Sequence, residues 1–271
     1  MNYRMPDFSR LMDGKIVLLA GTKGLLCSQI ASLFEEHGAK VCCVYRKGMD
    51  GHDDSCIDFS KPEDIHAEVH RILTGEKRID SLLLCMEPVR YIDAENMKQE
   101  EALAFTQGNL LAAHAFVQRV LPSMKEHCEG TIVGITSDYA VSSVPGVAMY
   151  SANAAGIQSY FRSIGIEYCK YGIRSNCVMP GFNPGDNGEA YRKMYGEEAT
   201  EDAFVRFQPI ERRGSCKEVA NVALFCASAM STFIQGENFP VNGGAMVVGH
   251  SQVWNVKDRP AYTHMYKKEG R

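Results

Sequence analysis

The sequence predicts an α/β fold, a doubly wound parallel sheet with helices on both faces, built as one domain over residues 1–271. Short apolar runs alternate along the chain with segments of helical period, which is typical of strand–helix–strand units with right-handed crossovers. Neither an internal repeat nor a low-complexity linker divides the chain. A length of 271 residues is also enough to bury one continuous core.

Each element of this fold is expected from its own pattern. Short, mainly aliphatic runs predict six buried strands, at residues 16–20, 40–45, 82–86, 131–136, 174–179 and 237–241. Apolar residues at helical spacing predict helices over 28–37, 62–73, 101–125, 150–171 and 217–227. Gly38 marks the end of the first helix, and Pro62 suits the first turn of the second.

Charge and composition exclude several classes of protein. A formal net charge of -4 argues against a nucleic-acid surface. No apolar stretch reaches the roughly 18 residues of a membrane span, and the N-terminal residues do not resemble a signal peptide. The ten cysteines include no Cys-x-x-Cys pair, so we expect no metal site. We therefore expect a cytosolic protein without a nucleic-acid or membrane partner.

Three residues form a candidate catalytic pattern. Ser137 follows the fourth predicted strand, and Tyr150 lies thirteen residues later, at the start of the run Tyr-Ser-Ala-Asn-Ala-Ala-Gly. Asn109 lies in Gln-Gly-Asn-Leu-Leu, within the long third helix. In doubly wound sheets, ligands bind beyond the carboxyl ends of the strands. Two hydroxyl groups there suit the binding and protonation of a substrate oxygen, although Ser137 alone would also suit a loop cap.

This pattern resembles the serine and the Tyr-x-x-x-Lys motif of the short-chain dehydrogenase/reductase family, whose fold is Rossmann-like. The resemblance covers residues 14–244, and the other matching segments are 130–137, 173–181, 213–214, 217–220 and 236–244. It implies an oxidoreductase that interconverts a hydrophobic ketone and an alcohol with a nicotinamide cofactor. Tyr150 would be the acid or base, Ser137 would orient the oxygen, and Asn109 would support the active-site helix. The family also implies a homo-oligomer, a dimer or a tetramer.

The family's lysine is missing, because Ala154 holds its position. A free phenol has a pKa of about 10, which is poorly matched to proton transfer near neutrality. In the family the lysine lies one helical turn from the tyrosine, stabilises the phenolate and holds the nicotinamide ribose. Alanine does neither, so another group or a water molecule has to replace it. Asn153, beside this position, is a candidate for the ribose contact.

The glycine-rich turn after the first strand also departs from the family pattern Gly-x-x-x-Gly-x-Gly. Gly21 keeps its place, whereas Leu25 and Cys27 replace the second and third glycines, and Gly24 lies one residue early. A side chain at Leu25 would crowd the phosphates, although Gly24 offers the turn another path. We expect Gly21, Gly24 and Leu26 to approach the dinucleotide.

Other positions of the cofactor site match. Asp58 corresponds to the family aspartate that contacts adenine, and Pro180 and Gly181 to the turn that packs near the nicotinamide. Arg46 lies where relatives that prefer the 2′-phosphate carry a basic residue, so NADP is slightly favoured over NAD. A solvated loop arginine is the alternative interpretation of Arg46. The family's Asn-Asn-Ala-Gly after the third strand is replaced by residues 84–87.

Two additions to the fold are expected. Residues 182–208 lie where relatives place a lid over the substrate, and its apolar residues predict a hydrophobic substrate or packing on the same domain: Tyr191, Met194, Tyr195, Phe204 and Phe207. Residues 245–271 extend beyond the family's usual end and predict a subunit-contact arm or a frayed tail.

Two other functions remain open at this point. A non-redox isomerase, dehydratase or lyase would use Ser137 and Tyr150 without a dinucleotide, and the bulky phosphate turn is typical of such a loss. A non-catalytic subunit that partners an active homologue is the third hypothesis. The fold alone does not decide among them.

Overall fold

The computed structural model describes residues 7–47, 56–181, 208–210 and 212–247, together with 192, 196 and 197. Its centre is one parallel sheet of six strands in the order β2-β1-β3-β4-β5-β6. The strands are β1 (Ile16–Gly21), β2 (Lys40–Tyr45), β3 (Ser81–Cys85), β4 (Gly130–Ile135), β5 (Ile173–Pro180) and β6 (Asn238–Val241). The predicted doubly wound sheet is confirmed, with all six strands near their expected places.

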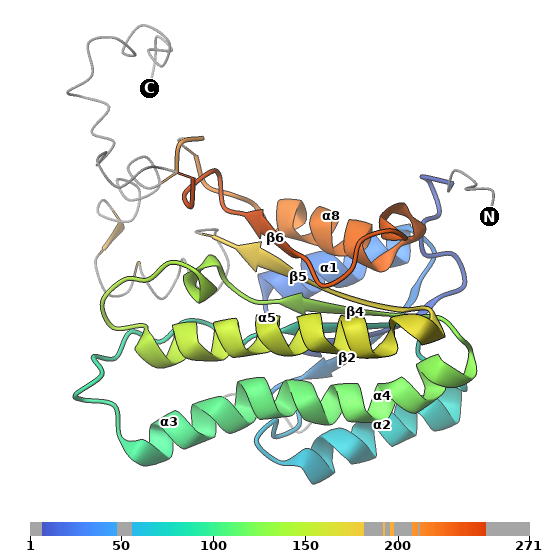
Figure 1. Ribbon diagram of the computed structural model, residues 1–271, viewed down its shortest axis with the longest axis horizontal. Helices are drawn as coiled ribbons and strands as arrows, with labels where there is room; N and C mark the ends of the chain where they lie inside the picture. Colours follow the sequence, from blue (N-terminus) through green and yellow to red (C-terminus); the bar gives the residue numbers. More distant parts are fainter. Residues whose placement is uncertain are drawn as a thin grey trace, which may run out of the picture.

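Helices cover both faces of this sheet (Figure 1). The helices are α1 (Leu25–Glu36), α2 (Pro62–Glu76), α3 (Gln99–Thr106), α4 (Ala112–Glu126), α5 (Ala148–Tyr168) and α8 (Cys216–Ala227). Helices α1 and α8 pack against each other on one face, and α2, α4 and α5 lie on the other. Three short 3₁₀ helices are η2 (Asp138–Ala140), η3 (Cys169–Tyr171) and η4 (Ala229–Ser231).

The single long helix expected over 101–125 is interrupted. Between α3 and α4 the chain forms a π-helical segment, η1 (Gln107–Leu111), with Asn109 at its centre. The side-chain Nδ2 of Asn109 donates to the carbonyl oxygen of Phe105 at 2.8 Å. A π-helical turn has one extra residue that no periodicity reveals, and such turns are frequent at functional sites.

The core forms one cluster on each face of the sheet. Phe116 and Phe161 are fully buried in the cluster beneath α2, α4 and α5, and Phe34 in the cluster beneath α1 and α8. Because both faces are covered, the central strands have almost no polar alternation. This is why short apolar runs predicted them correctly.

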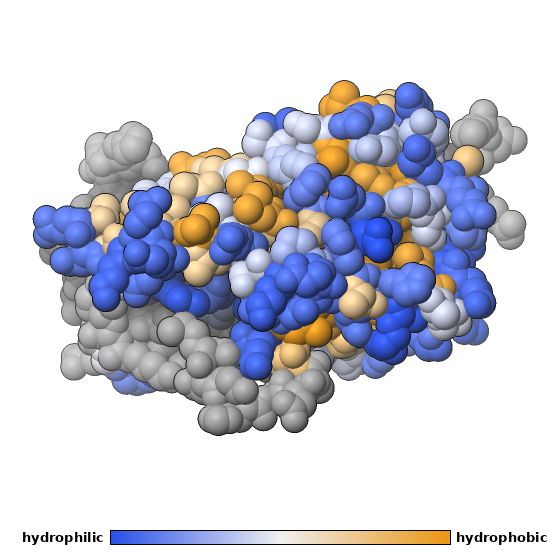
Figure 2. All heavy atoms as spheres, turned by 90° about the horizontal axis from the view of Figure 1, so that it is seen from below, coloured by the Kyte–Doolittle hydropathy of each residue, from blue (hydrophilic) through white to orange (hydrophobic). Residues whose placement is uncertain are grey.

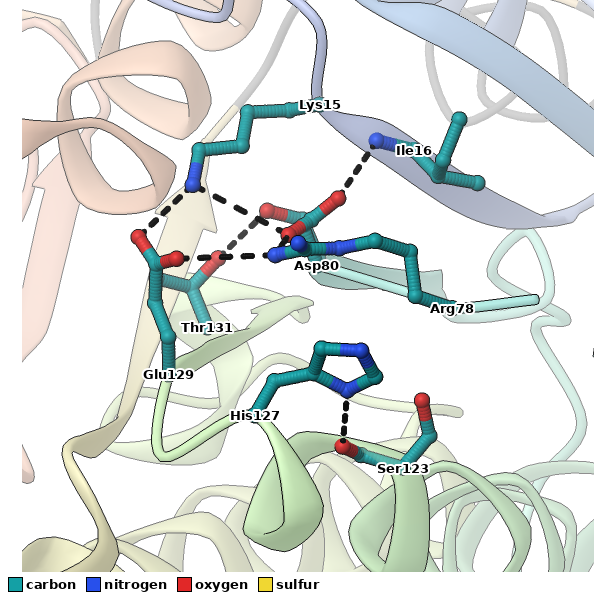
Figure 3. Close-up of polar contacts among 9 residues, drawn as sticks. Lys15, Ile16, Arg78, Asp80, Ser123, His127, Glu129 and Thr131 are labelled. Atoms are coloured by element: carbon teal, nitrogen blue, oxygen red, sulfur yellow. Dashed lines mark hydrogen bonds and ion pairs between the residues drawn. The ribbon is translucent and has the colours of Figure 1, made fainter. Parts of the chain in front are cut away.

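The amino ends of the strands are joined by a charged cluster around Asp80, the amino-edge cluster (Figure 3). Asp80 is 4% exposed, and its carboxylate accepts the backbone N–H of Ile16 at 2.7 Å. It also pairs with Arg78 and, at 3.8 Å, with Lys15. Glu129 pairs with the same Lys15 at 2.7 Å. These contacts fix the starts of β1, β3 and β4 relative to one another.

Much of the face seen in Figure 2 is hydrophilic, with separate apolar areas between the charged ones. Among the described helices, none is long and apolar enough to cross a membrane. The expected lid at 182–208 lies almost wholly outside the described residues, as does the tail from 248 onward, so both remain predictions.

Candidate active site

The carboxyl ends of the strands meet at the opposite edge of the sheet, the carboxyl edge, and most predicted site residues lie there. Gly21 ends β1, Pro180 ends β5, and Ser137 follows the end of β4 by two residues. Tyr150 lies in the first turn of α5, which packs against β5 and against η2, directly after Ser137. This is the edge at which doubly wound sheets bind their ligands.

Ser137 is buried and has defined hydrogen-bond partners. Its side chain is 2% exposed, and its Oγ accepts the backbone N–H of Tyr139 at 3.1 Å, which caps η2. Its hydroxyl group also donates to the carboxyl group of Asp138. Ser137 therefore acts as a loop cap, while the hydroxyl stays at the edge where a substrate oxygen would bind.

Tyr150 lies within a small aromatic cluster. Its ring is 6.2 Å from that of Phe105 and, in an edge-on arrangement, 6.2 Å from that of Tyr139. One helical turn further along α5, Ala154 is fully buried, so no side chain at that position supplies a charge. The neighbouring Asn153 faces α3 instead, donating to Thr106 Oγ1 at 3.3 Å.

Gln158 joins the segment of Ser137 to α5, the helix that carries Tyr150. It was not identified from the sequence. It lies on the same face of α5 as Tyr150, two turns later. Its Nε2 donates to Thr136 Oγ1 at 2.9 Å and to the carbonyl oxygen of Ser137 at 3.2 Å. Gln158 thus ties the end of β4 to the helix that carries Tyr150. The spacing of eight residues from Tyr150 was the only available signal.

Asn109 has its hydrogen-bonding capacity largely occupied. Besides the bond to Phe105, its Oδ1 accepts the backbone N–H of Glu87 at 2.9 Å, and its Nδ2 lies 3.4 Å from the Glu87 carboxylate. Asn109 is 4% exposed. It therefore holds the loop after β3 against the π-helical turn. The support of the active-site helix that the family resemblance implies stays a prediction.

Arg46 lies inside the molecule, which excludes the interpretation as a solvated loop residue. Its side chain is 11% exposed, its guanidinium stacks 4.6 Å from the Phe59 ring, and it pairs with Glu87 at 3.6 Å. The guanidinium is 3.5 Å from Asn109 Oδ1. It passes over Gly108, where a Cβ would lie only 2.8 Å from it. Burial lowers the pKa of Arg46 to about 10. A 2′-phosphate would have to compete with Glu87 for this side chain.

Asp138, the residue after Ser137, is a buried carboxyl group that the sequence did not single out. It is 7% exposed, and its Oδ2 accepts Nδ2 of Asn242 at 3.2 Å. The same oxygen lies 3.0 Å from where a Cβ on Gly181 would be. Burial raises the pKa of Asp138 to about 6. A carboxyl group that titrates near neutrality at a ligand-binding edge is suited to proton transfer.

The turn between β1 and α1 fits a pyrophosphate in several respects. A Cβ at Gly21 would lie 2.7 Å from Cys85 Cβ and 2.9 Å from Cys27 Sγ, so only glycine fits there. Helix α1 starts at Leu25 without a side-chain cap or an acidic residue in its first turn, which leaves its positive end open to an anion. The buried hydroxyl of Thr22, in the same turn, has no hydrogen-bond partner among the described residues.

The bulky residues of this turn do not fill it. Leu25 is 48% exposed, and Leu26 packs against the core cluster under α1. Gly24 lies directly before the helix, and its carbonyl oxygen accepts the first intrahelical bond, from Ser28. The contacts of Gly21, Gly24 and Leu26 with a dinucleotide stay predictions.

Asp58 directly follows the isolated β-bridge between Arg46 and Ile57. Its carboxylate accepts both the backbone N–H and the hydroxyl of Ser60, at 2.9 and 2.6 Å. Those bonds and the nearby Lys61 lower its pKa, against the raising effect of burial. Its contact with adenine also stays a prediction.

The cavities divide between the two edges. A void of about 20 Å³, enough for a single water molecule, lies among residues including Arg46, Asn109 and Ile157. A cavity of about 600 Å³ lies at the amino edge, beside Lys15 and Asp80. None of the candidate catalytic residues lines that larger cavity, so we do not assign the site to it.

Comparisons with known proteins agree with this arrangement. A family model described as enoyl-(acyl carrier protein) reductase matches residues 22–246. The chain is 28% identical over 247 residues to a 3-oxoacyl-(acyl-carrier-protein) reductase of Vibrio cholerae, covering 88% of this chain and 99% of that protein.

Solved structures share the fold. The crystal structure of levodione reductase superposes with a TM-score of 0.81 at 22% identity, covering 88% of this chain and 100% of that one. A gluconate 5-dehydrogenase of Burkholderia cenocepacia, solved with NADP and tartrate, has a TM-score of 0.80 at 21% identity, with 89% and 99% covered.

Proposed function

The chain belongs to the short-chain dehydrogenase/reductase family, a family of NAD(P)-dependent oxidoreductases, and we propose that it interconverts a hydrophobic ketone and the corresponding alcohol. The observation that carries the proposal is the placement of Ser137 and Tyr150. Both lie at the carboxyl edge, both contact Tyr139, and Gln158 ties their two elements together. A non-redox enzyme of the same fold needs no pyrophosphate site, whereas the open end of α1 and the unpartnered hydroxyl of Thr22 favour one.

The chain's own residues have distinct roles in this proposal. The turn at Gly21 and the first turn of α1 would hold the pyrophosphate, and Pro180 and Gly181 would hold the nicotinamide. The bound nicotinamide supplies or accepts the hydride. The hydroxyl groups of Ser137 and Tyr150 donate hydrogen bonds to the substrate oxygen, where negative charge develops during reduction. Asn109 and Gln158 position these groups.

The substrate class is proposed from the relatives. The matching Vibrio protein is named a 3-oxoacyl-(acyl-carrier-protein) reductase, so a 3-oxoacyl chain is the first hydrophobic ketone to test. NADP is slightly favoured over NAD, and a related structure contains NADP. We further propose a cytosolic homo-oligomer, with 182–208 as a lid over the substrate.

Oxidation of NADPH and NADH by the purified protein, in the presence of 3-oxoacyl thioesters or of polar ketoses, tests the proposal. We expect NADPH-dependent reduction of the thioesters. Tyr150→Phe should lower turnover about 10² to 10⁴-fold, because one donor to the reacting oxygen is lost. Tyr160→Phe is the matched control, since this tyrosine on α5 bonds to His114, outside the carboxyl edge. Turnover of Tyr150→Phe equal to that of the control would reject the role of Tyr150. If neither NADPH nor NADH is oxidised with any of these ketones, the proposed oxidoreductase activity is rejected.

A further inference from the structure

The carboxyl group of Asp138 is unusual among the buried charges of the described chain. It is adjacent in sequence to Ser137, and it lies between the ends of β4, β5 and β6, where Gly181 and Asn242 face it. Among the described residues it forms no ion pair. Its partners are neutral hydrogen-bond donors: the amide of Asn242, the hydroxyl of Ser137 and the backbone N–H groups of Asp138 and Tyr139. A buried carboxylate without a cation is costly, so this group is easily protonated.

The bond between Ser137 and Asp138 depends on the protonation of the carboxyl group. An ionised carboxylate only accepts, so the hydroxyl of Ser137 must then point its proton at Asp138. A protonated carboxyl group can donate instead. When Asp138 donates a hydrogen bond to the oxygen of Ser137, the hydroxyl proton of Ser137 is free to point at a substrate.

We propose that Asp138 is the proton reservoir of this active site, acting through the hydroxyl of Ser137 in place of the lysine that Ala154 has displaced. The inference rests on the proposed function and names the source of its proton. Asp138 is a positioning and proton-holding residue, because it acts on the substrate only through the hydroxyl of Ser137.

In the direction of reduction the step balances as follows. The carbonyl carbon takes the hydride with its electron pair, and the carbonyl oxygen takes the hydroxyl proton of Ser137. The Ser137 oxygen takes the carboxyl proton of Asp138 in return. Asp138 is left as a carboxylate and is protonated again from water, and the reverse sequence oxidises the alcohol. Tyr150 needs only to donate a hydrogen bond, so its phenol does not need a neighbouring cation.

The surroundings of Asp138 suit this exchange. Its pKa, raised to about 6 chiefly by burial, places both protonation states within reach near neutrality. Tyr139, in the same 3₁₀ helix as Asp138, interacts electrostatically with Asp138, with Tyr91 of the loop after β3, and with Tyr150 of α5. Burial raises the pKa of Tyr139, so this phenol stays neutral. Asn242 and Gly181, which directly follow β6 and β5 and face Asp138, carry no charge.

Two measurements test the inference. In the first, ¹³C NMR of protein labelled at the aspartate carboxyl carbon follows the titration of Asp138, assigned by its loss in Asp138→Asn. We expect a midpoint near 6, and a higher midpoint in Ser137→Ala, because the hydroxyl that stabilises the carboxylate is gone. This readout needs neither substrate nor turnover. An unchanged midpoint in Ser137→Ala would overturn the inference even if the protein is an active reductase.

The second measurement is the pH profile of ketone reduction. The wild-type rate should fall about tenfold for each pH unit above the midpoint, as protonated Asp138 becomes scarce. Asp138→Asn should reduce the rate at pH 5 at least tenfold. It should also remove the break in the pH profile, that is, the pH above which the rate begins to fall. A wild-type protein inactive with all ketones would defeat the proposed function, while the NMR titration would still decide whether Ser137 and Asp138 are coupled.

Asn242→Ala separates a proton-holding role from a merely structural one. The variant keeps the carboxyl group but removes a bond that stabilises its ionised form, so the NMR midpoint and the break in the rate should both move to higher pH. If Asp138 only fastens the loop to the end of β6, Asn242→Ala should lower the rate at every pH and leave the break unmoved. That result would overturn the proposal.

Discussion

Asp80 and Asp138 are buried carboxyl groups at opposite edges of the same sheet, 4% and 7% exposed. Asp80 pairs with Arg78 and Lys15 and accepts the first backbone N–H of β1. In the part of the chain that the structure describes, Asp138 has only neutral partners: the side chains of Ser137 and Asn242 and the backbone N–H groups of Asp138 and Tyr139. The amino edge thus matches each buried charge with cations, whereas the carboxyl edge leaves one carboxyl group free to change its protonation.

The difference in partners separates a carboxyl group that stabilises the fold from one that is suited to proton transfer. A buried charge with paired partners resists removal, because the partners would be left without compensation. A buried carboxyl group without a cation shifts its pKa instead, and such groups concentrate at functional sites. For the chemistry of the site, the position of Asp138 beside Ser137 therefore matters more than how deeply its carboxyl group is buried.

The largest expected effect on stability is at the amino edge. Asp80→Ala should lower the free energy of unfolding by about 3 to 4 kcal/mol, because Arg78 and Lys15 lose their buried partner and the N–H of Ile16 loses its acceptor. Lys15 and Arg78 are about a third exposed, which moderates the loss. Urea denaturation measures it. Asp138→Asn at pH 7 is the matched control at the other edge, and an equal loss there would contradict the distinction.

The dependence of stability on pH sharpens the comparison. The folded pKa of Asp138 lies above the ordinary aspartate value of 3.8, at about 6, so its contribution to stability is fully present below about pH 4 and is lost as the pH rises through 6. A shift of this size corresponds to about 2 to 3 kcal/mol. The difference in unfolding free energy between wild type and Asp138→Asn should therefore change by this amount between pH 4 and pH 7.

Paired denaturation curves at those two pH values measure that change. Carboxylates with lowered pKa, such as Glu218, act in the opposite sense in both proteins and cancel in the difference. A constant difference would show that the pKa of Asp138 is not raised in the folded protein.

A smaller effect is expected where the two catalytic elements are joined. Gln158→Leu keeps the approximate volume but leaves Thr136 and the carbonyl oxygen of Ser137 without their donor, which should destabilise the protein by about 1 to 3 kcal/mol. Turnover should fall further than stability explains, since Ser137 loses its alignment. Turnover per folded molecule equal to that of wild type would show that the tie is only structural.

How far the sequence predicts the molecule differs between its parts. The strands and the helices could be predicted because both faces of the sheet are covered, so each element has a strong apolar pattern. Ser137 and Tyr150 could be proposed because they belong to one local motif. The inward turn of Arg46 could not, since it depends on the space over Gly108 and on the ring of Phe59.

Asp138 was missed for a related reason. A polar residue directly after a strand is common and does not by itself indicate a site. The surroundings that distinguish Asp138 include Asn242, which is 104 residues away in the sequence. The π-helical turn around Asn109 was hidden because one extra residue per turn does not disturb an apolar pattern over so short a length.

The proposed activity depends on a dinucleotide at the carboxyl edge, and a fluorescence titration of NADPH and NADH with the purified protein tests this most directly. We predict saturable binding in the micromolar range, tighter for NADPH. Gly21→Val should abolish it, because the added side chain would collide with Cys85 and Cys27. Absence of binding by the wild-type protein at millimolar nucleotide would contradict the account.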